Sequence, residues 1–181
     1  MGNKLYWIDG PWPGKLALAS RPRGGDWLED EIASWQRAGI ARVFSLLTAD
    51  EEQDLDLTRE AAEVKARGMK FTSLPIPDRG VPNSESELTA ALDEVDADLL
   101  SARNVVVHCR QGIGRSGLLA ACLLVSKGSD PKSAVEKISA ARGVPVPETA
   151  EQRRWIDHYA AVLASPRMIS AAENHGVRSR S

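Results

Sequence analysis

The sequence predicts an α/β domain in which helices flank a central, mostly parallel sheet. Short β-like runs alternate with segments of helical periodicity along most of the 181 residues, and this alternation is typical of a parallel sheet covered by helices. Residues 104–108, NVVVH, are rich in β-branched side chains, which indicates a central strand buried on both faces. The length fits one domain. We assign it to residues 1–165 and expect residues 166–181 to form a flexible tail, because periodicity ends near Ser165.

The first half of the chain contains most of the predicted strands. Residues 5–8 and 16–20 flank a turn rich in Gly and Pro, and we expect them to pair as a hairpin at the edge of the sheet. The segment 26–39 predicts a helix, with Asp26 as its N-cap and Ala38 as its last residue, since Gly39 follows the end. The elements expected after it are a strand at 41–47, a helix at 57–68 and a strand at 69–76.

The second half is predicted to be helical apart from the central strand. Ser84 precedes a helical pattern and is expected to cap it. The helices expected here run from about 85 to 100, from 116 to 128, from 130 to 143 and from 149 to 163.

Composition and charge argue against several classes of protein. No apolar run reaches the ~20 residues that span a bilayer, and the N-terminus lacks the apolar core of a signal peptide, so a cytoplasmic location is expected. The net charge of −2 disfavours a nucleic-acid partner. The two cysteines and three histidines show none of the spacings typical of metal ligands, so we expect no metal or other cofactor. The sequence gives no basis for an oligomeric state.

The segment HCRQGIGRSG joins the central strand to the next helix. Gly112 and Gly114 allow a tight turn whose N–H groups point to one centre beside a helix N-terminus, which is an anion site. Arg115 adds a planar guanidinium that suits two phosphate oxygens. Cys109 faces the same positive field, so we expect it to be a thiolate at neutral pH and a nucleophile toward a bound phosphoryl group.

The rest of this loop is expected to serve the same anion. Ser116 can donate a hydrogen bond to the Cys109 sulfur, both before attack and as it leaves. Cys122 lies in the apolar part of the following helix and is interpreted as a core residue. A Walker phosphate loop is excluded, because no Lys-Ser/Thr pair follows the glycines. The residues expected to bind the phosphoryl group are Arg110, Gln111, Gly112, Ile113, Gly114 and Arg115.

A general acid is also required, because a thiolate displaces an alcohol or phenol only if the leaving oxygen is protonated. Asp78, in LPIPDRGVP, is the candidate, since its proline-rich loop follows a strand and should lie at the same sheet edge as Cys109. The alternative is an aspartate in a plain turn, Pro-Asp-x-Gly being a common turn sequence. The neighbouring Arg79 either attracts a charged substrate or is only solvated.

HCRQGIGRSG resembles the Cys-x5-Arg-Ser signature of the cysteine-dependent protein phosphatases, the protein-tyrosine and dual-specificity group. The resemblance implies that Cys109 and Arg115 are catalytic and that a phosphocysteine intermediate forms. It also implies an acid about thirty residues before the cysteine, and Asp78 lies 31 residues before Cys109 (78 to 109). His108 would be a supporting residue that orients the loop. The short chain favours the compact dual-specificity or kinase-associated type.

VPVPETAEQRRWI resembles the segment in which part of that family carries a glutamine that positions the hydrolytic water. Gln152 is the matching position. The alternative is structural, because Thr149 and Gln152 have the spacing of a capping box. The sequence leaves both roles open.

These residues predict a phosphatase that acts on phosphotyrosine, and on phosphoserine or phosphothreonine, in proteins. A phosphoinositide substrate is one alternative, since Arg110 matches one of two basic loop positions of the related lipid phosphatases, whereas Ile113 replaces the other. A pseudophosphatase that binds phosphate without turnover is a second alternative, which the presence of Cys109, Arg115 and Asp78 disfavours. Sulfur transfer is a third, but it would have no use for Asp78.

Overall fold

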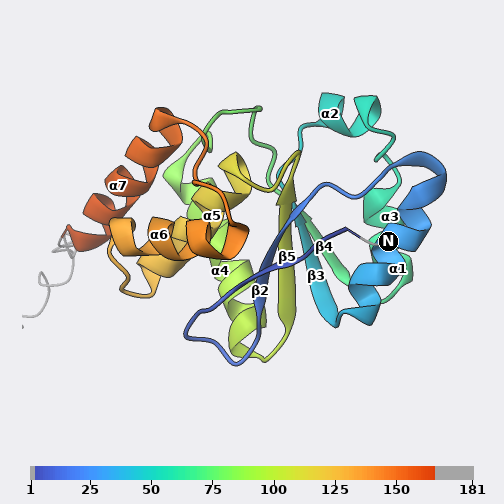
Figure 1. Cartoon of the computed structure of the whole chain (residues 1–181), viewed down its shortest axis with the longest axis horizontal. Helices are drawn as coiled ribbons and strands as arrows, with labels where there is room; N and C mark the ends of the chain where they lie inside the picture. Colours follow the sequence, from blue (N-terminus) through green and yellow to red (C-terminus); the bar gives the residue numbers. More distant parts are fainter. Residues whose placement is uncertain (1–2, 166–181) are drawn as a thin grey trace, which may run out of the picture.

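A five-stranded sheet runs through the middle of the computed structural model, which describes residues 3–165 (Figure 1). The strand order is β1-β2-β5-β3-β4; β1 pairs antiparallel with β2, and the other pairs are parallel. The predicted α/β class, the central strand and the hairpin at the edge are confirmed. The predicted tail at 166–181 lies outside the described residues. The strands are Tyr6–Ile8 (β1), Leu16–Ser20 (β2), Ile40–Ser45 (β3), Lys70–Ser73 (β4) and Asn104–Cys109 (β5).

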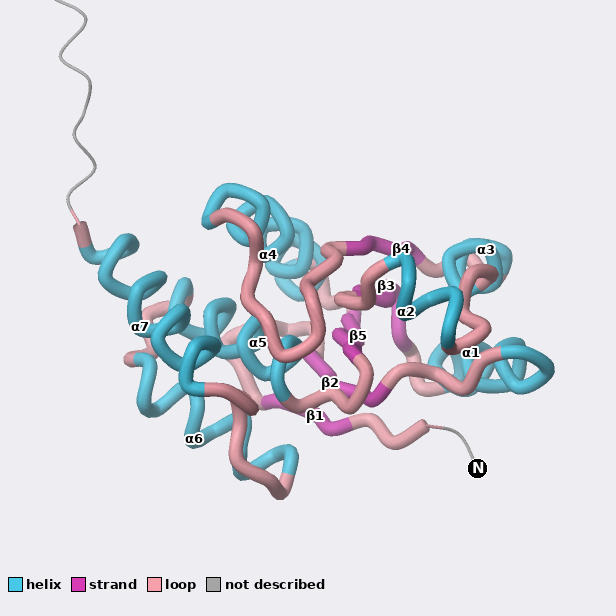
Figure 2. The backbone as a smooth tube through the Cα atoms, turned by 90° about the horizontal axis from the view of Figure 1, so that it is seen from above, coloured by secondary structure: helices cyan, strands magenta, loops and turns pink. Residues whose placement is uncertain are grey.

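Helices cover both faces of the sheet (Figure 1). On one face lie α1 (Leu28–Arg37) and α3 (Glu60–Ala66); on the other lie α4 (Glu85–Leu100) and α5 (Gly114–Ser126). Figure 2 shows α6 (Pro131–Arg142) and α7 (Ala150–Ala164) as an outer layer beside α5. Within the described range 3–165, no helix combines the length and the apolar character that crossing a bilayer requires.

The central strand β5 serves two separate cores. Val105 and Val107 pack with the buried residues of α4 and α5, and Cys109 belongs to the same cluster. Val106 faces the other way, into the core beneath α1 and α3. Successive side chains of a strand point to opposite faces, so His108 lies on the side of α1, where its ring is 5.7 Å from that of Trp35.

The start of α1 differs from the prediction. Asp26 does not cap the helix, because the chain enters it through a 3-10 turn, Gly25–Trp27, in which the N–H of Trp27 donates to the Gly24 carbonyl (3.3 Å). Trp27 therefore occupies the N-cap position, and no side chain caps the helix. The cap at Ser84 is confirmed, since its side chain accepts a hydrogen bond from the N–H of Glu87.

A short helix, α2 (Ala49–Asp54), was not predicted. Six residues are too few for an amphipathic period, but the sequence carries another signal for its start. The N–H of Glu51 donates to the Thr48 hydroxyl (3.4 Å), while the Glu51 carboxylate accepts from the N–H of Thr48 (3.1 Å). This capping box marks the helix start just after β3.

Candidate active site

The carboxyl ends of the parallel strands meet at the upper edge of the sheet in Figure 1. Cys109 is the last residue of β5, Arg115 lies in the first turn of α5, and Asp78 lies in the segment after β4. All three line one small pocket, as do Arg110, Gln111, Gly114 and Glu148. The helix α5 begins at Gly114, two residues earlier than the sequence suggested, so Arg115 is helical.

The backbone of the loop between β5 and α5, residues 110–113, is fixed by contacts with β2 and α6. Gly112 has φ +67°, and a Cβ there would lie 2.3 Å from the Ala19 carbonyl oxygen, so both the dihedral and the close approach require glycine. Arg142, the last residue of α6, donates from Nε to the Gly112 carbonyl (2.7 Å) and from Nη2 to the Gln111 carbonyl (2.9 Å). In trans peptides the N–H groups of Gly112 and Ile113 then point away from Arg142.

Arg142 itself is well fixed. It is buried, and its guanidinium carbon lies 3.8 Å from the centroid of the Tyr6 ring on β1. A planar guanidinium suits both a stacked aromatic and a pair of carbonyl acceptors. The edge hairpin and α6 therefore both hold the loop of residues 110–113.

Arg115 is held by two carboxylates although it is almost fully buried. Nη1 and Nη2 donate to the two oxygens of Glu51 at 2.7 and 2.9 Å, and Nη2 donates to Oδ1 of Asp78 at 3.0 Å. Nη1 also donates to the carbonyl of Ile76 (2.8 Å). Burial acts to lower the pKa of Arg115, but the hydrogen bonds to Glu51 and the nearby anionic groups outweigh it and raise that pKa. The guanidinium therefore stays charged in the pocket.

Glu51 stays ionised for the same reason. Burial acts to raise the pKa of its carboxyl group, but the hydrogen bond from Arg115 and the N–H of Thr48 bring the pKa below its ordinary value of 4.5. Its carboxylate thus caps α2 and orients Arg115 at the same time. Glu51 was not predicted as a site residue, although Thr48-x-x-Glu51 has the spacing of a capping box.

The Asp78 loop is tied to the pocket from several sides. The Asp78 carboxylate is half-exposed, at 51%, and accepts from the N–H of Arg79 (3.1 Å). Arg79 has φ +59°, and its Nη1 donates to Oε1 of Glu148 at 2.6 Å. Asp78 is therefore accessible to a substrate, and Arg79 is paired rather than only solvated.

A family model described as a Swiss Army Knife protein, DSP-PTPase phosphatase domain, matches residues 3–161. The chain belongs to this phosphatase family. Cyclin-dependent kinase inhibitor 3 of Sus scrofa is 33% identical over 140 residues, which are 76% of this chain and 66% of that protein. The chain thus aligns with slightly less than two thirds of the length of this relative.

Two solved structures have folds similar to that of this domain. A kinase associated phosphatase, with serine in place of its catalytic-site cysteine, superposes with a TM-score of 0.82 at 20% identity, covering 91% of this chain and 98% of that one. Tk-PTP in its active form gives a TM-score of 0.72 at 26% identity and covers 87% and 96%. The first of these, at its low identity, supports the fold alone.

In this phosphatase domain Gln152 is buried and does not line the pocket. Its Oε1 accepts from the N–H groups of Glu148 and Thr149, each at 3.1 Å, and the Gln152 N–H donates to the Thr149 hydroxyl (3.1 Å). This is the capping box that the sequence offered as one alternative. The side chain also donates from Nε2 to the carbonyl of Gly80 (3.0 Å), so it ties the Asp78 loop to α7.

Two other predicted residues have surroundings that the sequence did not show. Ser116 is buried, and its hydroxyl forms no hydrogen bond with any described residue, so the expected bond to the Cys109 sulfur is absent from this structure. His108 is buried with its Nε2 2.8 Å from Oε1 of Glu60, although the two groups are not aligned as a hydrogen bond. Burial raises the pKa of the Cys122 thiol, which fits its interpretation as a core residue.

Three further residues of the site escaped the sequence analysis, namely Glu148, Arg142 and Glu60. Glu148 stands four residues before Gln152 in VPVPETAEQ, just before the predicted capping box. Arg142 precedes Gly143 at the end of a helix, which is an ordinary place for a basic residue. Glu60 lies in the predicted helix at 57–68 and is the first residue of α3, where a glutamate is common because it favours the helix N-terminus. Only Glu148 had a local sequence signal, since it lies in the segment already singled out.

Proposed function

We propose that this domain is a metal-independent phosphomonoesterase that hydrolyses phosphotyrosine, and phosphoserine or phosphothreonine, in proteins. The observation that supports it is the pocket that Cys109, Arg115 and Asp78 share. A nucleophile, a fixed cation and a carboxylic acid around one phosphate-sized pocket are the groups that this reaction needs. A cytoplasmic location stays a prediction from the sequence.

The first step transfers the phosphoryl group to sulfur. The Cys109 thiolate attacks phosphorus in line with the ester oxygen, forming the S–P bond as the P–O bond breaks. Arg115 and the N–H groups of residues 110–115 hold the three remaining phosphoryl oxygens. Asp78 gives its proton to the departing oxygen, which leaves as an alcohol or phenol.

The second step releases phosphate. Water attacks the phosphorus of phosphocysteine, Asp78 accepts the proton of that water, and the S–P bond breaks to return the thiolate. Glu148 lines the pocket, whereas Gln152 is turned to the cap. We therefore place Glu148 before Gln152 as the residue that orients this water, and keep Gln152 as a positioning residue for the Asp78 loop.

The test is hydrolysis of aryl phosphates in the presence of a chelator. We expect turnover in the wild type, none in Cys109→Ser, and a loss of about 100-fold to 10,000-fold in Asp78→Ala. The loss in Asp78→Ala should be smaller for a nitrophenyl ester than for a phenyl ester, because a better leaving group needs less protonation. Activity that survives Cys109→Ser would contradict the proposal.

Two matched controls distinguish chemistry from damage to the fold. Cys122→Ala removes the other thiol, which is buried in the core. Asp9→Ala removes an exposed aspartate just after Ile8, which pairs with Leu16 at the end of β2 farthest from Cys109. Both should retain turnover. Phosphate binding without turnover in the wild type would instead favour the pseudophosphatase alternative.

The phosphoinositide alternative has one observation in its favour. Arg110 is exposed and lines the pocket, where it can meet an anionic headgroup. Ile113 gives the loop no second basic side chain, so we rank lipid substrates below phosphoproteins. Initial rates on phosphotyrosine, phosphothreonine and phosphoinositide substrates would rank these three substrate classes.

A further inference from the structure

A second pocket adjoins the proposed phosphate-binding loop, residues 110–115, on the side of β2. Its volume is about 290 Å³, and its lining residues are Asn3, Ser20, Arg21, Arg23, Glu31 and Arg110. Arg110 lines both this pocket and the one that contains Cys109. The two therefore open next to each other, and we call the second one the basic pocket.

The fold sets the distance between the two pockets. Ser20 at the end of β2 is the register partner of Cys109 at the end of β5, so the segment that leaves β2 starts beside the phosphate-binding loop. The Ser20 hydroxyl donates to the carbonyl of Gln111 (3.2 Å), and the N–H of Arg21 donates to the carbonyl of Arg110 (3.4 Å). A ligand that reaches from one pocket to the other thus meets a fixed spacing.

The basic pocket has an excess of positive charge. Arg23 donates to Glu31 from Nε (2.9 Å) and Nη2 (2.7 Å), and the side chain of Glu31 is 2% exposed. Within residues 3–165, neither Arg21 nor Arg110 forms an ion pair with a carboxylate. Three arginines face one glutamate, although the whole chain has a net charge of −2.

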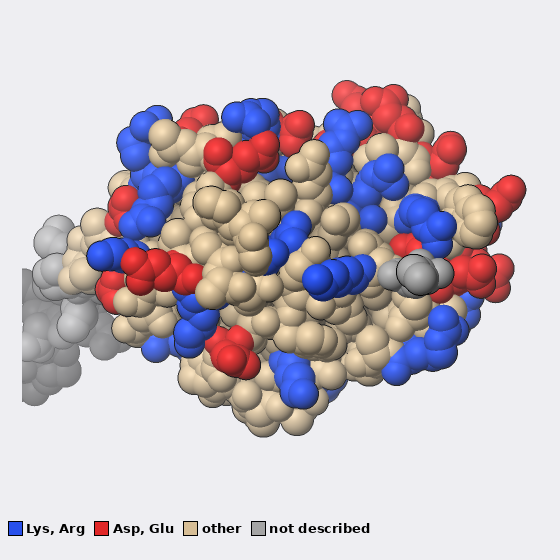
Figure 3. Space-filling model, viewed as in Figure 1, with Lys and Arg blue, Asp and Glu red and all other residues tan. Residues whose placement is uncertain are grey.

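The distribution of charge on the surface agrees with this local excess. Figure 3 shows basic side chains over the segment between β2 and α1, and acidic side chains gathered over α2. Arginines without a carboxylate partner, side by side at a concave surface, suit phosphate or carboxylate groups, because the guanidinium binds both through two parallel hydrogen bonds.

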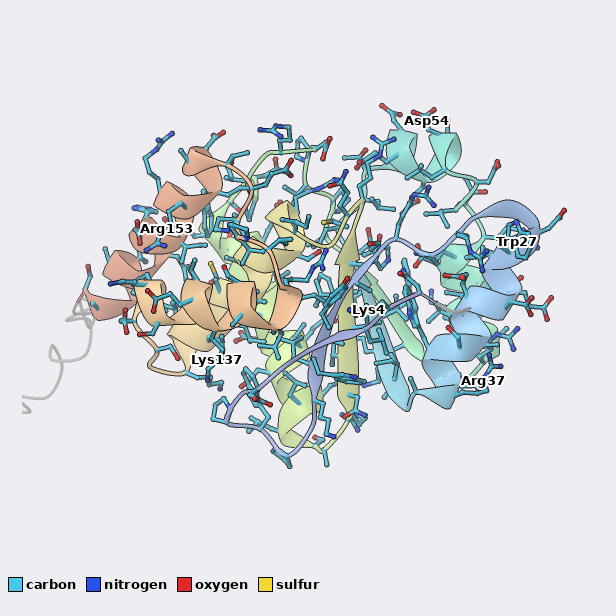
Figure 4. All side chains as sticks on the ribbon, viewed as in Figure 1. Lys4, Trp27, Arg37, Asp54, Lys137 and Arg153 are labelled. Carbon is cyan, nitrogen blue, oxygen red and sulfur yellow. The ribbon has the colours of Figure 1, made fainter. Side chains whose placement is uncertain are left out.

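An exposed tryptophan favours a peptide as the bearer of that anion. Trp27 is 56% exposed, and the Arg23 guanidinium lies 4.5 Å from the centroid of its ring. Figure 4 places Trp27 at the start of α1, at the outer end of the segment that leads from β2. Tryptophan and arginine are enriched among the residues that dominate protein–protein binding.

We propose that the basic pocket binds a second anionic group of the same phosphoprotein whose phosphoryl group enters the Cys109 pocket. This inference rests on the proposed function, and it narrows the substrate class. The preferred substrates carry a second phosphorylated or acidic residue close in sequence to the one that is hydrolysed.

Binding to Cys109→Ser tests the inference without requiring turnover. The probes are phosphotyrosine peptides that differ in one neighbouring residue, which is alanine, glutamate or phosphoserine at successive positions on either side. We expect the dissociation constant to fall about threefold to tenfold for glutamate or phosphoserine at one or two positions. Equal affinity for all the peptides, or stronger binding to phosphoinositide vesicles than to any peptide, would overturn the proposal.

Variants locate the effect. Two variants should remove most of the difference in dissociation constant between the alanine and phosphoserine peptides: Arg21→Gln, and Arg23→Gln combined with Glu31→Gln. The double change avoids leaving Glu31 buried without its arginine partner. Arg37→Gln removes an equal charge at the far end of α1 (Figure 4) and should keep the difference. A difference that is unchanged in Arg21→Gln and in the double variant would assign the preference elsewhere.

The wild type then separates the two hypotheses. If it hydrolyses aryl phosphate but shows no preference among the peptides in kcat/KM or in binding, the proposed function stands and the basic pocket has no role in substrate choice. If it binds the doubly anionic peptide best but hydrolyses none, the inference stands and the proposed function fails.

Discussion

Arg115 is oriented before any phosphate arrives, and Glu51 is the residue that orients it. The two side chains share a pair of hydrogen bonds of 2.7 and 2.9 Å in a buried site. Each hydrogen bond to a charged group contributes about 1.5–3 kcal/mol. Asp78 occupies a third position on the same guanidinium, so a bound phosphoryl group can replace Asp78 while Glu51 keeps its hold.

Glu51→Gln should therefore weaken catalysis more than folding. The amide keeps one oxygen for the cap of α2 but loses the charge and one acceptor for Arg115, so we expect kcat/KM to fall roughly tenfold to a hundredfold. Affinity for vanadate, measured by inhibition, should fall in parallel. Glu52→Gln, the adjacent change on the same helix, is the control and should do neither, since Glu52 does not contact Arg115.

Gly112 offers a second prediction at the scale of one residue. Gly112→Ala adds a Cβ that meets the Ala19 carbonyl at 2.3 Å, and a displacement of the loop by about 1 Å is enough to lower the rate about 100-fold. Gly143→Ala is the matched control, because Gly143 has a similar φ of +74° and no atom within 4 Å of the added Cβ. The control should cost about 1–2 kcal/mol of unfolding free energy and leave kcat/KM intact. Equal losses of activity in both variants would argue against the clash.

At the scale of elements, the start of α7 does two things that the sequence could not separate. Its capping box satisfies the helix N-terminus, and Gln152 extends from the box to the Gly80 carbonyl. Gly114 allows this approach, because a Cβ there would lie 3.0 Å from the side chains of Gln152 and Glu148. The cap of α7 and the Asp78 loop are thus joined through the side-chain amide of Gln152.

Two substitutions separate the cap from the tether. Thr149→Ala removes only the cap and should lower the free energy of unfolding by about 1 kcal/mol with little change in kcat. Gln152→Ala removes the cap and the bond to Gly80, so kcat should fall as well, because the Asp78 loop is less well held. Thermal unfolding and kcat on an aryl phosphate measure the two effects. If the two variants have equal kcat, the tether has no part in catalysis.

At the scale of the whole molecule, sequence pattern was sufficient for the sheet and for the three central residues of the site. The β-branched run at β5 and the Gly-rich turn after it are local signals, so Cys109 and Arg115 could be placed without a structure. The contacts of Arg142 and Glu60 depend on which helices lie beside the loop, and no pattern within one segment encodes that. Glu51 lies between these cases: its cap was visible in the sequence, but its bond to Arg115 spans 64 residues.

A polar cluster away from the site contains Asp98, through which we expect the stability of the fold to depend on pH. Asp98, near the end of α4, is 1% exposed and accepts hydrogen bonds from Arg42 on β3, from Arg103 (2.7 Å) and from Lys70 (3.3 Å). Burial acts to raise the pKa of Asp98, but these donors, Arg42 first, bring it below its ordinary value of 3.8. Removal of one partner of a buried ion pair costs about 3–5 kcal/mol.

Asp98→Asn should therefore lower the free energy of unfolding by about 3 kcal/mol at neutral pH, the lower end of that range, because Arg42 keeps its pair with Glu94. Since the folded-state pKa of Asp98 lies below its unfolded value, the unfolded chain takes up the proton first as pH falls. The stabilisation is then complete above about pH 4 and is lost below it. Urea unfolding of both proteins at neutral pH and near pH 3 measures this, with Asp93→Asn, an exposed change on the same helix, as the control. The difference in unfolding free energy between the wild type and Asp98→Asn should be smaller near pH 3 than at neutral pH. A larger difference near pH 3 would mean that Asp98 is not held as a charged group in the folded protein.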